Sequence, residues 1–323
     1  MSKTIIIGTR KSALALWQSE WVAARIREHG LEVELKKIST KGDKILDVAL
    51  AKVGDKGLFV KELEEALLRG EIDMAVHSMK DMPTETPEGL TIGAICERED
   101  SRDVLLSSQY NSLDELPQNA IVGTSSLRRI AQLLHYRGDL QIKDLRGNIN
   151  TRLQKMEDGE YDAIILAAAG VLRLGWHDKI KQFLPPTVSL SAVGQGSVGI
   201  EVAAANEEIK PLLEQLNDRE SMLCVLAERA LLNYLEGGCQ VPIGAYASLE
   251  DEKELTMQAL IADLKGEKLY RAHGTTSQLT VEGVRELGVK LAQDLVAQGG
   301  DVILHDIGIE IGRTPTHGSS ESD

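Results

Sequence analysis

Basic side chains recur directly after the expected strands of this chain, and their positions predict a site for an anion. Arg10 follows the Gly-Thr turn of "IIIGTRK", and Arg128 and Arg129 follow the matching turn of "IVGTSSLRR". A cation near a helix N-terminus opposes the helix dipole, and a bound anion removes that cost. Because the guanidinium fork binds carboxylates at two points, we expect a ligand with several carboxylates. The other cations of this pattern are Lys11, Lys80, Arg146, Arg152 and Arg173.

The overall charge limits the partners of such a site. The chain has 323 residues, with 50 acidic and 36 basic side chains and a net charge of -14. An acidic chain of this kind lacks the basic face that nucleic-acid binding needs, so an anion has to meet a local group of cations. One alternative is that the arginines form surface ion pairs, as most do. A phosphate ligand is a second alternative, although no Walker loop is present.

One acidic side chain, Asp81 in "VHSMKDMPTE", stands among these cations. The neighbouring Lys80 favours its ionised form at neutral pH. Asp81 has two interpretations. It either caps a turn before Pro83, or it stabilises a cationic intermediate and moves protons.

A thiol follows two glycines in "LEGGCQVPIG", at Cys239. Cys239 is either a small filler residue between a helix and a strand or a thiol presented for chemistry. His77 could act as its base, as in cysteine hydrolases, but the sequence around His77 is typical of the end of a buried strand, and no local thiol-histidine signature is present. The cysteines Cys96, Cys224 and Cys239 are odd in number and far apart, which argues against a disulfide framework and a zinc site and favours a reducing cytoplasm.

The elements that position these residues form a repeated plan. Residues 5–7 are expected to form a strand and "SALALWQSEWVAARIREHG" a helix, and "AIVGTSSLRRIAQLLHYRG" repeats the same order. "RGEIDMAVHS" is echoed by "DGEYDAIILA". Strands that alternate with helices predict two similar doubly wound α/β lobes, like those of periplasmic binding proteins, with mostly parallel sheets and a hinge. No apolar run is long enough for a bilayer, and the N-terminal apolar stretch is too short for a signal peptide, so we expect no membrane partner.

The chain is expected to cross between the lobes twice, near "CERED" and near "AVGQGSVGIEV". The predicted first lobe is therefore residues 1–97 and 197–216, and the second is 98–196. Residues 217–312 predict a small α+β domain that carries Cys239, and residues 313–323 a disordered tail. "GQGSVG" matches a dinucleotide-binding fingerprint, but a strand rather than a helix is expected after it, which favours a crossing loop.

Together these motifs resemble the porphobilinogen deaminases, also called hydroxymethylbilane synthases. The resemblance runs in order from about Ile5 to the final helix. Its most specific parts are "HSMKD" and "EGGCQVPIG", and it extends over "GTRKSALALWQ", "KGLFVKELE", "VGTSSLRR", "LRGNINTRL", "YDAIILAAAG" and "AVGQG".

The resemblance implies an enzyme that condenses four porphobilinogen molecules onto a covalent dipyrromethane primer, releases ammonia, and hydrolyses the product to linear hydroxymethylbilane for haem and other tetrapyrroles. It implies a thioether from Cys239 to the dipyrromethane and a catalytic role for Asp81. The implied lid loop contains Lys52, Lys56 and Phe59. A cytoplasmic monomer is expected. The implied cofactor-binding and substrate-binding residues are Arg10, Ser78, Lys80, Thr124, Ser126, Arg128, Arg129, Arg146, Arg152 and Arg173.

The sequence departs from the family pattern at two places. Ser197 stands where the family commonly has alanine, and Leu172 stands where lysine is frequent. A two-lobed solute-binding protein is the competing interpretation. It would explain the arginines but neither Cys239 nor Asp81.

Overall fold

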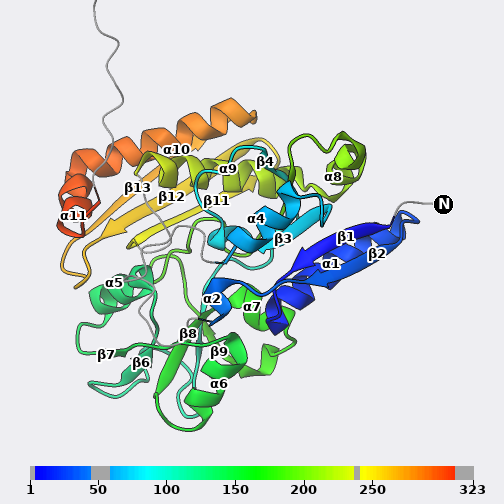
Figure 1. Ribbon diagram of the computed structural model, residues 1–323. Coiled ribbons are helices and arrows are strands. Elements are labelled where there is room, and N and C mark those ends of the chain that lie inside the picture. The colour runs from blue at the N-terminus through cyan, green and yellow to red at the C-terminus, as the bar shows by residue number, and fades with distance from the viewer. Residues whose placement is uncertain (1–3, 45–58, 236–240, 310–323) are drawn as a thin grey trace, which may run out of the picture.

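The computed structural model describes residues 4–44, 59–235 and 241–309. Cys239, Lys52, Lys56 and the tail 313–323 lie outside these residues. Figure 1 shows two sheet-and-helix lobes and a third domain in which two long helices lie along a sheet. The expected fold class is therefore confirmed.

The first lobe is built on a five-stranded sheet in the order β2-β1-β3-β10-β4. Helices α1 and α8 cover one face and α4 covers the other, through separate apolar clusters. The strands are β1 (Ile5–Thr9), β2 (Val33–Lys37), β3 (Met74–Ser78), β4 (Leu90–Ile95) and β10 (Val198–Ala203). The helices are α1 (Ala13–Glu28), α2 (Lys41–Lys44), α4 (Lys61–Leu68) and α8 (Lys210–Leu216), with short 3-10 turns η1 (Met79–Asp81) and η3 (Glu207–Ile209).

The second lobe repeats this topology in the order β7-β6-β8-β5-β9. Helices α6 and α7 pack on one face of its sheet and α5 on the other. The strands are β5 (Asp103–Leu106), β6 (Ile121–Gly123), β7 (Gln141–Lys143), β8 (Ala163–Ala167) and β9 (Ile180–Phe183). The helices are α5 (Leu127–Tyr136), α6 (Ile149–Glu157) and α7 (Ala168–Arg173), with the 3-10 turn η2 (His177–Lys179).

One strand in each lobe runs against the others. β10 pairs antiparallel with β3 and β4, and β5 pairs antiparallel with β8 and β9. Each is the strand that the chain enters directly from the other lobe, so its direction follows from the crossing. The expectation of mostly parallel sheets is confirmed, with this one reversal in each.

The two crossing segments, residues 96–102 and 192–197, lie side by side. The N–H of Glu99 donates to the carbonyl of Gly196 at 3.2 Å. Gly196 has φ +94°, and a Cβ there would lie 2.3 Å from the Glu99 carbonyl oxygen, so only glycine allows this close approach. Strand β10 follows directly, as expected for a crossing loop rather than a nucleotide site.

The third domain packs α9 (Arg219–Tyr234) and α10 (Val281–Leu295) on an antiparallel sheet of β11 (Ile243–Glu250), β12 (Glu254–Ala262) and β13 (Leu269–Thr276). The sequence predicts that the last helix stops at its glycines. Gly299, with φ +104°, interrupts the helical backbone inside the turn Val296–Gly300, as expected, and a further short helix, α11 (Asp301–Asp306), follows it. The domain boundaries given above stay a prediction.

Candidate active site

The end of strand β3 positions three of the predicted site residues. The strand is buried up to its last residue, Ser78, and the chain then turns through η1. The Ser78 hydroxyl accepts a hydrogen bond from Gln18 Nε2 of α1 at 2.9 Å. Met79 is buried, and its N–H donates to the carbonyl of Ser197 in the second crossing segment at 3.0 Å. The turn is thereby fixed between the first sheet and the crossing.

Lys80 and Asp81 occupy this turn but differ in their surroundings. Lys80 is half-buried, and its Nζ donates to Gln195 Oε1 at 3.3 Å. Asp81 is exposed, and its carboxylate accepts no hydrogen bond from residues in the described ranges. Ser78, not Asp81, is the N-cap of η1. In the described ranges, therefore, no hydrogen bond of the Asp81 side chain supports the interpretation that Asp81 caps a turn.

A buried carboxylate of the second lobe, Asp103, holds the paired arginines. Its Oδ2 lies 2.8 Å from Arg128 Nη1, and its Oδ1 lies 2.6 Å from Arg129 Nη2. Gln195 Nε2 donates to Oδ1 at 2.9 Å, and Ser189 Oγ donates to Oδ2 at 2.7 Å. Gln195 thus connects Lys80 of the first lobe with Asp103 of the second.

The electrostatics of this cluster leave an excess of positive charge. Burial by itself would raise the pKa of Asp103, but Arg128 and Arg129 outweigh it and hold that pKa well below its ordinary value. One carboxylate faces two guanidinium groups, which leaves one net positive charge. The Nε atoms of Arg128 and Arg129 are buried and have no hydrogen-bond partner in the described chain. Each guanidinium therefore retains a donor.

Thr124 and Ser126 lie in the loop that leads from β6 into α5. Thr124 is buried, and its Oγ1 accepts the N–H of Ser126 at 3.3 Å. Ser126 is the N-cap residue of α5, but its side chain makes no capping hydrogen bond. Its hydroxyl is not used to cap the helix at whose start the paired arginines lie.

Arg146 and Arg152 flank the start of α6. Arg146 Nε lies 2.5 Å from Asp144 Oδ2, and Arg152 Nε donates to the carbonyl of Gly147 at 2.8 Å. Both side chains are half-buried. In each of the two arginines, Nε therefore contacts a residue of the loop that precedes α6.

Asp81 interacts electrostatically with cations of both lobes. Burial, and after it the positive charge of Arg129, lower the pKa of Lys80 to about 8, whereas Asp81 opposes this shift. Burial and then Arg129 also lower the pKa of Arg152, and Asp81 again opposes the shift. The structure thus brings Lys80, Asp81, Arg129 and Arg152 into one electrostatic cluster.

Arg10 and Arg173 lie elsewhere around this cluster. The Arg10 guanidinium carbon is 4.3 Å from the centroid of the Phe59 ring, the described residue of the expected lid loop. Arg173, at the end of α7, donates from Nη2 to the carbonyl of Gly196 at 2.7 Å. Arg173 is therefore tied to the crossing segment, and Arg10 to the edge of the first lobe.

Sequence reasoning missed Asp103 and Gln195. Asp103 opens the apolar strand "DVLL", and an acid at the start of a fully buried strand is a signal for a buried partner. Gln195 lies inside the glycine loop "GQG" of the expected second crossing. Neither signal identifies the partner.

His77 is not available as a base for a thiol. Its Nε2 lies 3.0 Å from Glu201 Oε2, and both side chains are buried inside the first lobe. Glu64 of α4 completes this cluster, with its pKa raised to about 7 by burial and then by Glu201. The described chain therefore gives no support to a cysteine hydrolase that uses His77.

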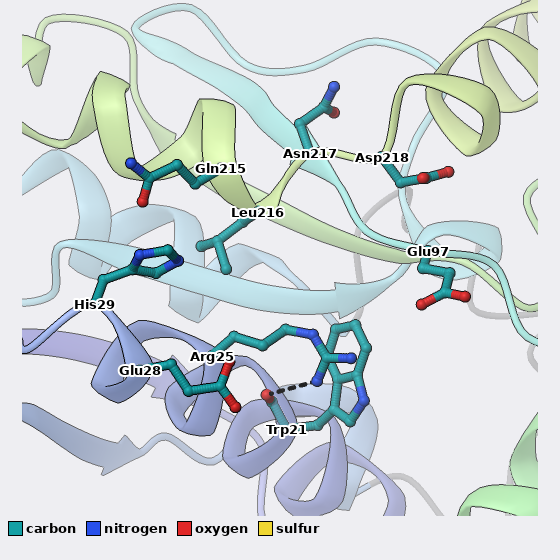
Figure 2. A pocket seen from close by; sticks show the side chains of 9 residues that line it. All are labelled: Trp21, Arg25, Glu28, His29, Glu97, Gln215, Leu216, Asn217 and Asp218. Atoms are coloured by element: carbon teal, nitrogen blue, oxygen red, sulfur yellow. Dashed lines mark hydrogen bonds between the residues drawn. The ribbon is translucent and has the colours of Figure 1, made fainter.

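A cavity of about 300 Å³ is lined by a different set of residues, which Figure 2 shows. Its walls come from the C-terminal half of α1, from Glu97, and from the end of α8 with the residues that follow it. In Figure 2 the Arg25 guanidinium lies across the Trp21 ring. The lining residues are Trp21, Arg25, Glu28, His29, Glu97, Gln215, Leu216, Asn217 and Asp218, and they include none of the predicted site residues.

The chain folds into two similar lobes joined by two crossings, and an exposed carboxylate lies among cations from both lobes. These features define a class of two-lobed proteins suited to ligands with several carboxylates. A family model described as porphobilinogen deaminase, dipyromethane cofactor binding domain, matches residues 5–211, and one described as porphobilinogen deaminase, C-terminal domain, matches residues 222–297. The chain belongs to the porphobilinogen deaminase family.

Two curated relatives agree with this assignment. The porphobilinogen deaminase of Desulforamulus reducens is 50% identical over 95% of this chain and 99% of its own length. That of Pelotomaculum thermopropionicum is 52% identical over 94% of this chain and 97% of its own length. A solved nutrient-binding protein from Burkholderia cenocepacia, bound to methionine, covers 66% of this chain and 89% of its own length with 17% identity and a TM-score of 0.40, and a likeness this weak says nothing about function.

The family is that of the hydroxymethylbilane synthases, which are transferases of tetrapyrrole biosynthesis with a dipyrromethane cofactor and porphobilinogen as substrate. The family match favours this activity over the solute-binding alternative. No helix in the described ranges is long and apolar enough to cross a membrane.

Proposed function

We propose that Asp81 is the catalytic carboxylate of this hydroxymethylbilane synthase. Loss of ammonia from porphobilinogen leaves a cationic carbon, and a fixed carboxylate stabilises that charge most where the charge develops. The exposure of Asp81 and its lack of a hydrogen-bond partner in the described chain support this role. A carboxylate already committed to a cap would be a weaker acceptor for pyrrole N–H groups.

The cations around Asp81 are proposed to bind the acetate and propionate groups of the pyrroles. The donor set fits a dipyrromethane, because the Nε atoms of Arg128 and Arg129 are buried donors without a described partner and the cluster carries excess positive charge. When bound, the dipyrromethane supplies the nucleophilic pyrrole carbon that starts the chain. The remaining residues proposed for binding are Arg10, Ser78, Lys80, Thr124, Ser126, Arg146, Arg152 and Arg173.

Cys239 is the proposed attachment residue. The other two cysteines support this assignment by contrast, because Cys96 and Cys224 are buried and burial raises the pKa of each thiol to about 12. Thiols of this kind are poor nucleophiles, since the thiolate is the reactive form. Cys239 follows the end of α9, at Tyr234, by a few residues of chain.

The test of this function is the intact mass of the purified protein. The wild-type chain should exceed its sequence mass by two linked pyrrole units. Cys239→Ser should fold without that excess, because a hydroxyl is a much weaker nucleophile than a thiol. Cys224→Ser is the matched control and should keep the added mass. A Cys239→Ser protein that still carries covalent pyrrole after denaturation would refute the assignment.

A cytoplasmic monomer with a lid loop that contains Lys52, Lys56 and Phe59 completes the proposal. Its support is the resemblance and, for Phe59, the position of its ring beneath the Arg10 guanidinium. Light scattering at assay concentration tests the monomer, and Phe59→Ala tests whether Arg10 depends on this loop.

A further inference from the structure

Arg173 is held on two sides, and two of its guanidinium nitrogens have no hydrogen bond in the described ranges. Its side chain belongs to α7 of the second lobe, and the residue is only 9% exposed. Nη2 donates to the Gly196 carbonyl at 2.7 Å, while Nε and Nη1 have no hydrogen bond to any residue of the described ranges. Burial lowers the pKa of Arg173, and Glu99 of the crossing segment opposes that shift.

The second contact of Arg173 comes from the other lobe. The guanidinium carbon lies 5.6 Å from the centroid of the Trp17 ring of α1, within the range of a cation–π interaction. Helix α1 also packs against α7 at this point. A guanidinium that lies over an indole ring and donates from Nη2 to a carbonyl is restricted in its rotation, so the edge formed by Nε and Nη1 keeps one direction.

The Trp17 ring is itself supported along α1. Trp17, Trp21 and Arg25 are spaced by four residues and therefore share one face of the helix. The rings of Trp17 and Trp21 are stacked with centroids 6.3 Å apart and an interplanar angle of 22°. The Arg25 guanidinium lies 3.3 Å above the Trp21 ring, and Figure 2 shows this far end of the row. The row runs Arg173, Trp17, Trp21, Arg25, and only Arg173 belongs to the second lobe.

We propose that Trp17 is a positioning residue for carboxylate recognition by Arg173. Its ring fixes the plane of the guanidinium, so that the open edge is presented to a pyrrole carboxylate. Because Trp17 and Arg173 lie in different lobes, full recognition requires the two lobes to be in the arrangement seen here. The inference rests on the proposed role of Arg173 in the function above.

The experiment compares Trp17→Leu and Trp17→Phe with wild type in steady-state turnover of porphobilinogen, at matched cofactor content determined by intact mass. Loss of one cation–π platform should raise KM about fivefold in Trp17→Leu and less in Trp17→Phe, with kcat changed by less than about twofold. The comparison variant is Trp21→Leu, which removes the ring stacked on Trp17 but no contact to Arg173, and it should raise KM less than Trp17→Leu does.

A double-variant cycle separates positioning from a general loss of structure. In an Arg173→Leu background, Trp17→Leu should change KM by no more than about twofold, because the group that Trp17 positions is absent. The proposal is overturned if the increases in KM caused by Trp17→Leu and Arg173→Leu multiply in the double variant. It is also overturned if Trp17→Leu lowers the melting temperature but leaves KM unchanged. If Trp17→Leu fails to fold, the same double-variant cycle is measured with Trp17→Phe and Trp17→His. If the wild-type chain lacks the added mass of two pyrrole units, the proposed function itself is refuted, and this result is obtained before any variant is measured.

Discussion

The two lobes share one topology but surround a buried carboxylate with different groups. The reversed strand of each lobe carries a buried carboxylate, Glu201 on β10 and Asp103 on β5. In the first lobe Glu201 meets His77, with Glu64 nearby. In the second lobe Asp103 meets two arginines. The buried carboxylate of the reversed strand therefore lies close to Glu64, whose pKa is raised to about 7, in the first lobe, and in a permanently cationic cluster in the second.

This difference explains how one fold provides both halves of the proposed chemistry. Arginine keeps its charge in a buried site, so the second lobe can offer fixed positive charge to carboxylates. The first lobe places only a few cations at its strand ends and leaves Asp81 exposed beside Lys80. In the proposed function, anion binding is therefore concentrated in the second lobe, and the first lobe supplies the reactive carboxylate.

The largest expected effect follows from removing the charge of Asp103. Asp103→Asn leaves two buried arginines with a neutral partner, and loss of one member of a buried ion pair costs about 3–5 kcal/mol of unfolding free energy. Urea denaturation measures this. Asp139→Asn, which breaks a half-buried pair with Arg137 in the same lobe, is the control and should have a smaller effect, because water still reaches both side chains. Equal losses of unfolding free energy in both variants would mean that the buried Asp103 cluster contributes no more than an ordinary ion pair.

The second prediction concerns the carboxylate that the first lobe contributes. Asp81→Asn should lower turnover at least ~100-fold, the order expected for one electrostatic group in a transition state. Asp81→Glu retains the charge but misplaces it and should keep part of the activity. Steady-state turnover at matched cofactor content is the measurement. Turnover like that of wild type in Asp81→Asn would return Asp81 to a structural role.

The third prediction tests the titrating cluster of the first lobe. Glu64 faces Glu201 of β10, His77 of β3, and Lys61 and Glu65 of its own helix, and its pKa is raised to about 7. Between its ordinary pKa and 7 the folded protein holds a proton that the unfolded chain releases, so this group's contribution to stability falls as pH rises to 7 and stays lost above it.

Glutamine resembles the protonated carboxyl and does not titrate. Glu64→Gln should therefore match wild type near pH 5 and be more stable by about 1–3 kcal/mol at pH 8. Urea denaturation at the two pH values gives both numbers. A difference that does not change with pH would contradict the assignment of the proton to Glu64.

The smallest effect is expected where the lobes meet. The hydroxyl of Ser197 is buried in the second crossing segment without a described hydrogen-bond partner. Ser197→Ala removes this unsatisfied group and should stabilise the protein by about 1 kcal/mol in thermal unfolding. Ser191→Ala is the matched control, because the Ser191 hydroxyl donates to the Ser101 carbonyl at 2.7 Å, and its loss should destabilise. A destabilised Ser197→Ala would mean that the hydroxyl has a partner.

The sequence by itself determined the repeated strand-turn-helix plan, the cations that follow the strands and the exposed acid in "HSMKD". These features are local, because hydrophobic periodicity and glycine turns act over a few residues. The position of Arg128 and Arg129 at the start of α5 follows from the same local reading. The resemblance to the family then supplied the chemistry of Cys239 and Asp81.

Only the tertiary structure decided which charges meet. Asp103 and Arg128 are 25 residues apart, and Asp103 and Gln195 are 92 apart, so no local pattern links them. His77 and Glu201 are 124 residues apart and meet because β10 returns antiparallel beside β3. Trp17 and Arg173 meet because the two lobes pack against each other. Ion pairs and ring contacts depend on distance in space, and the two chain crossings set those distances.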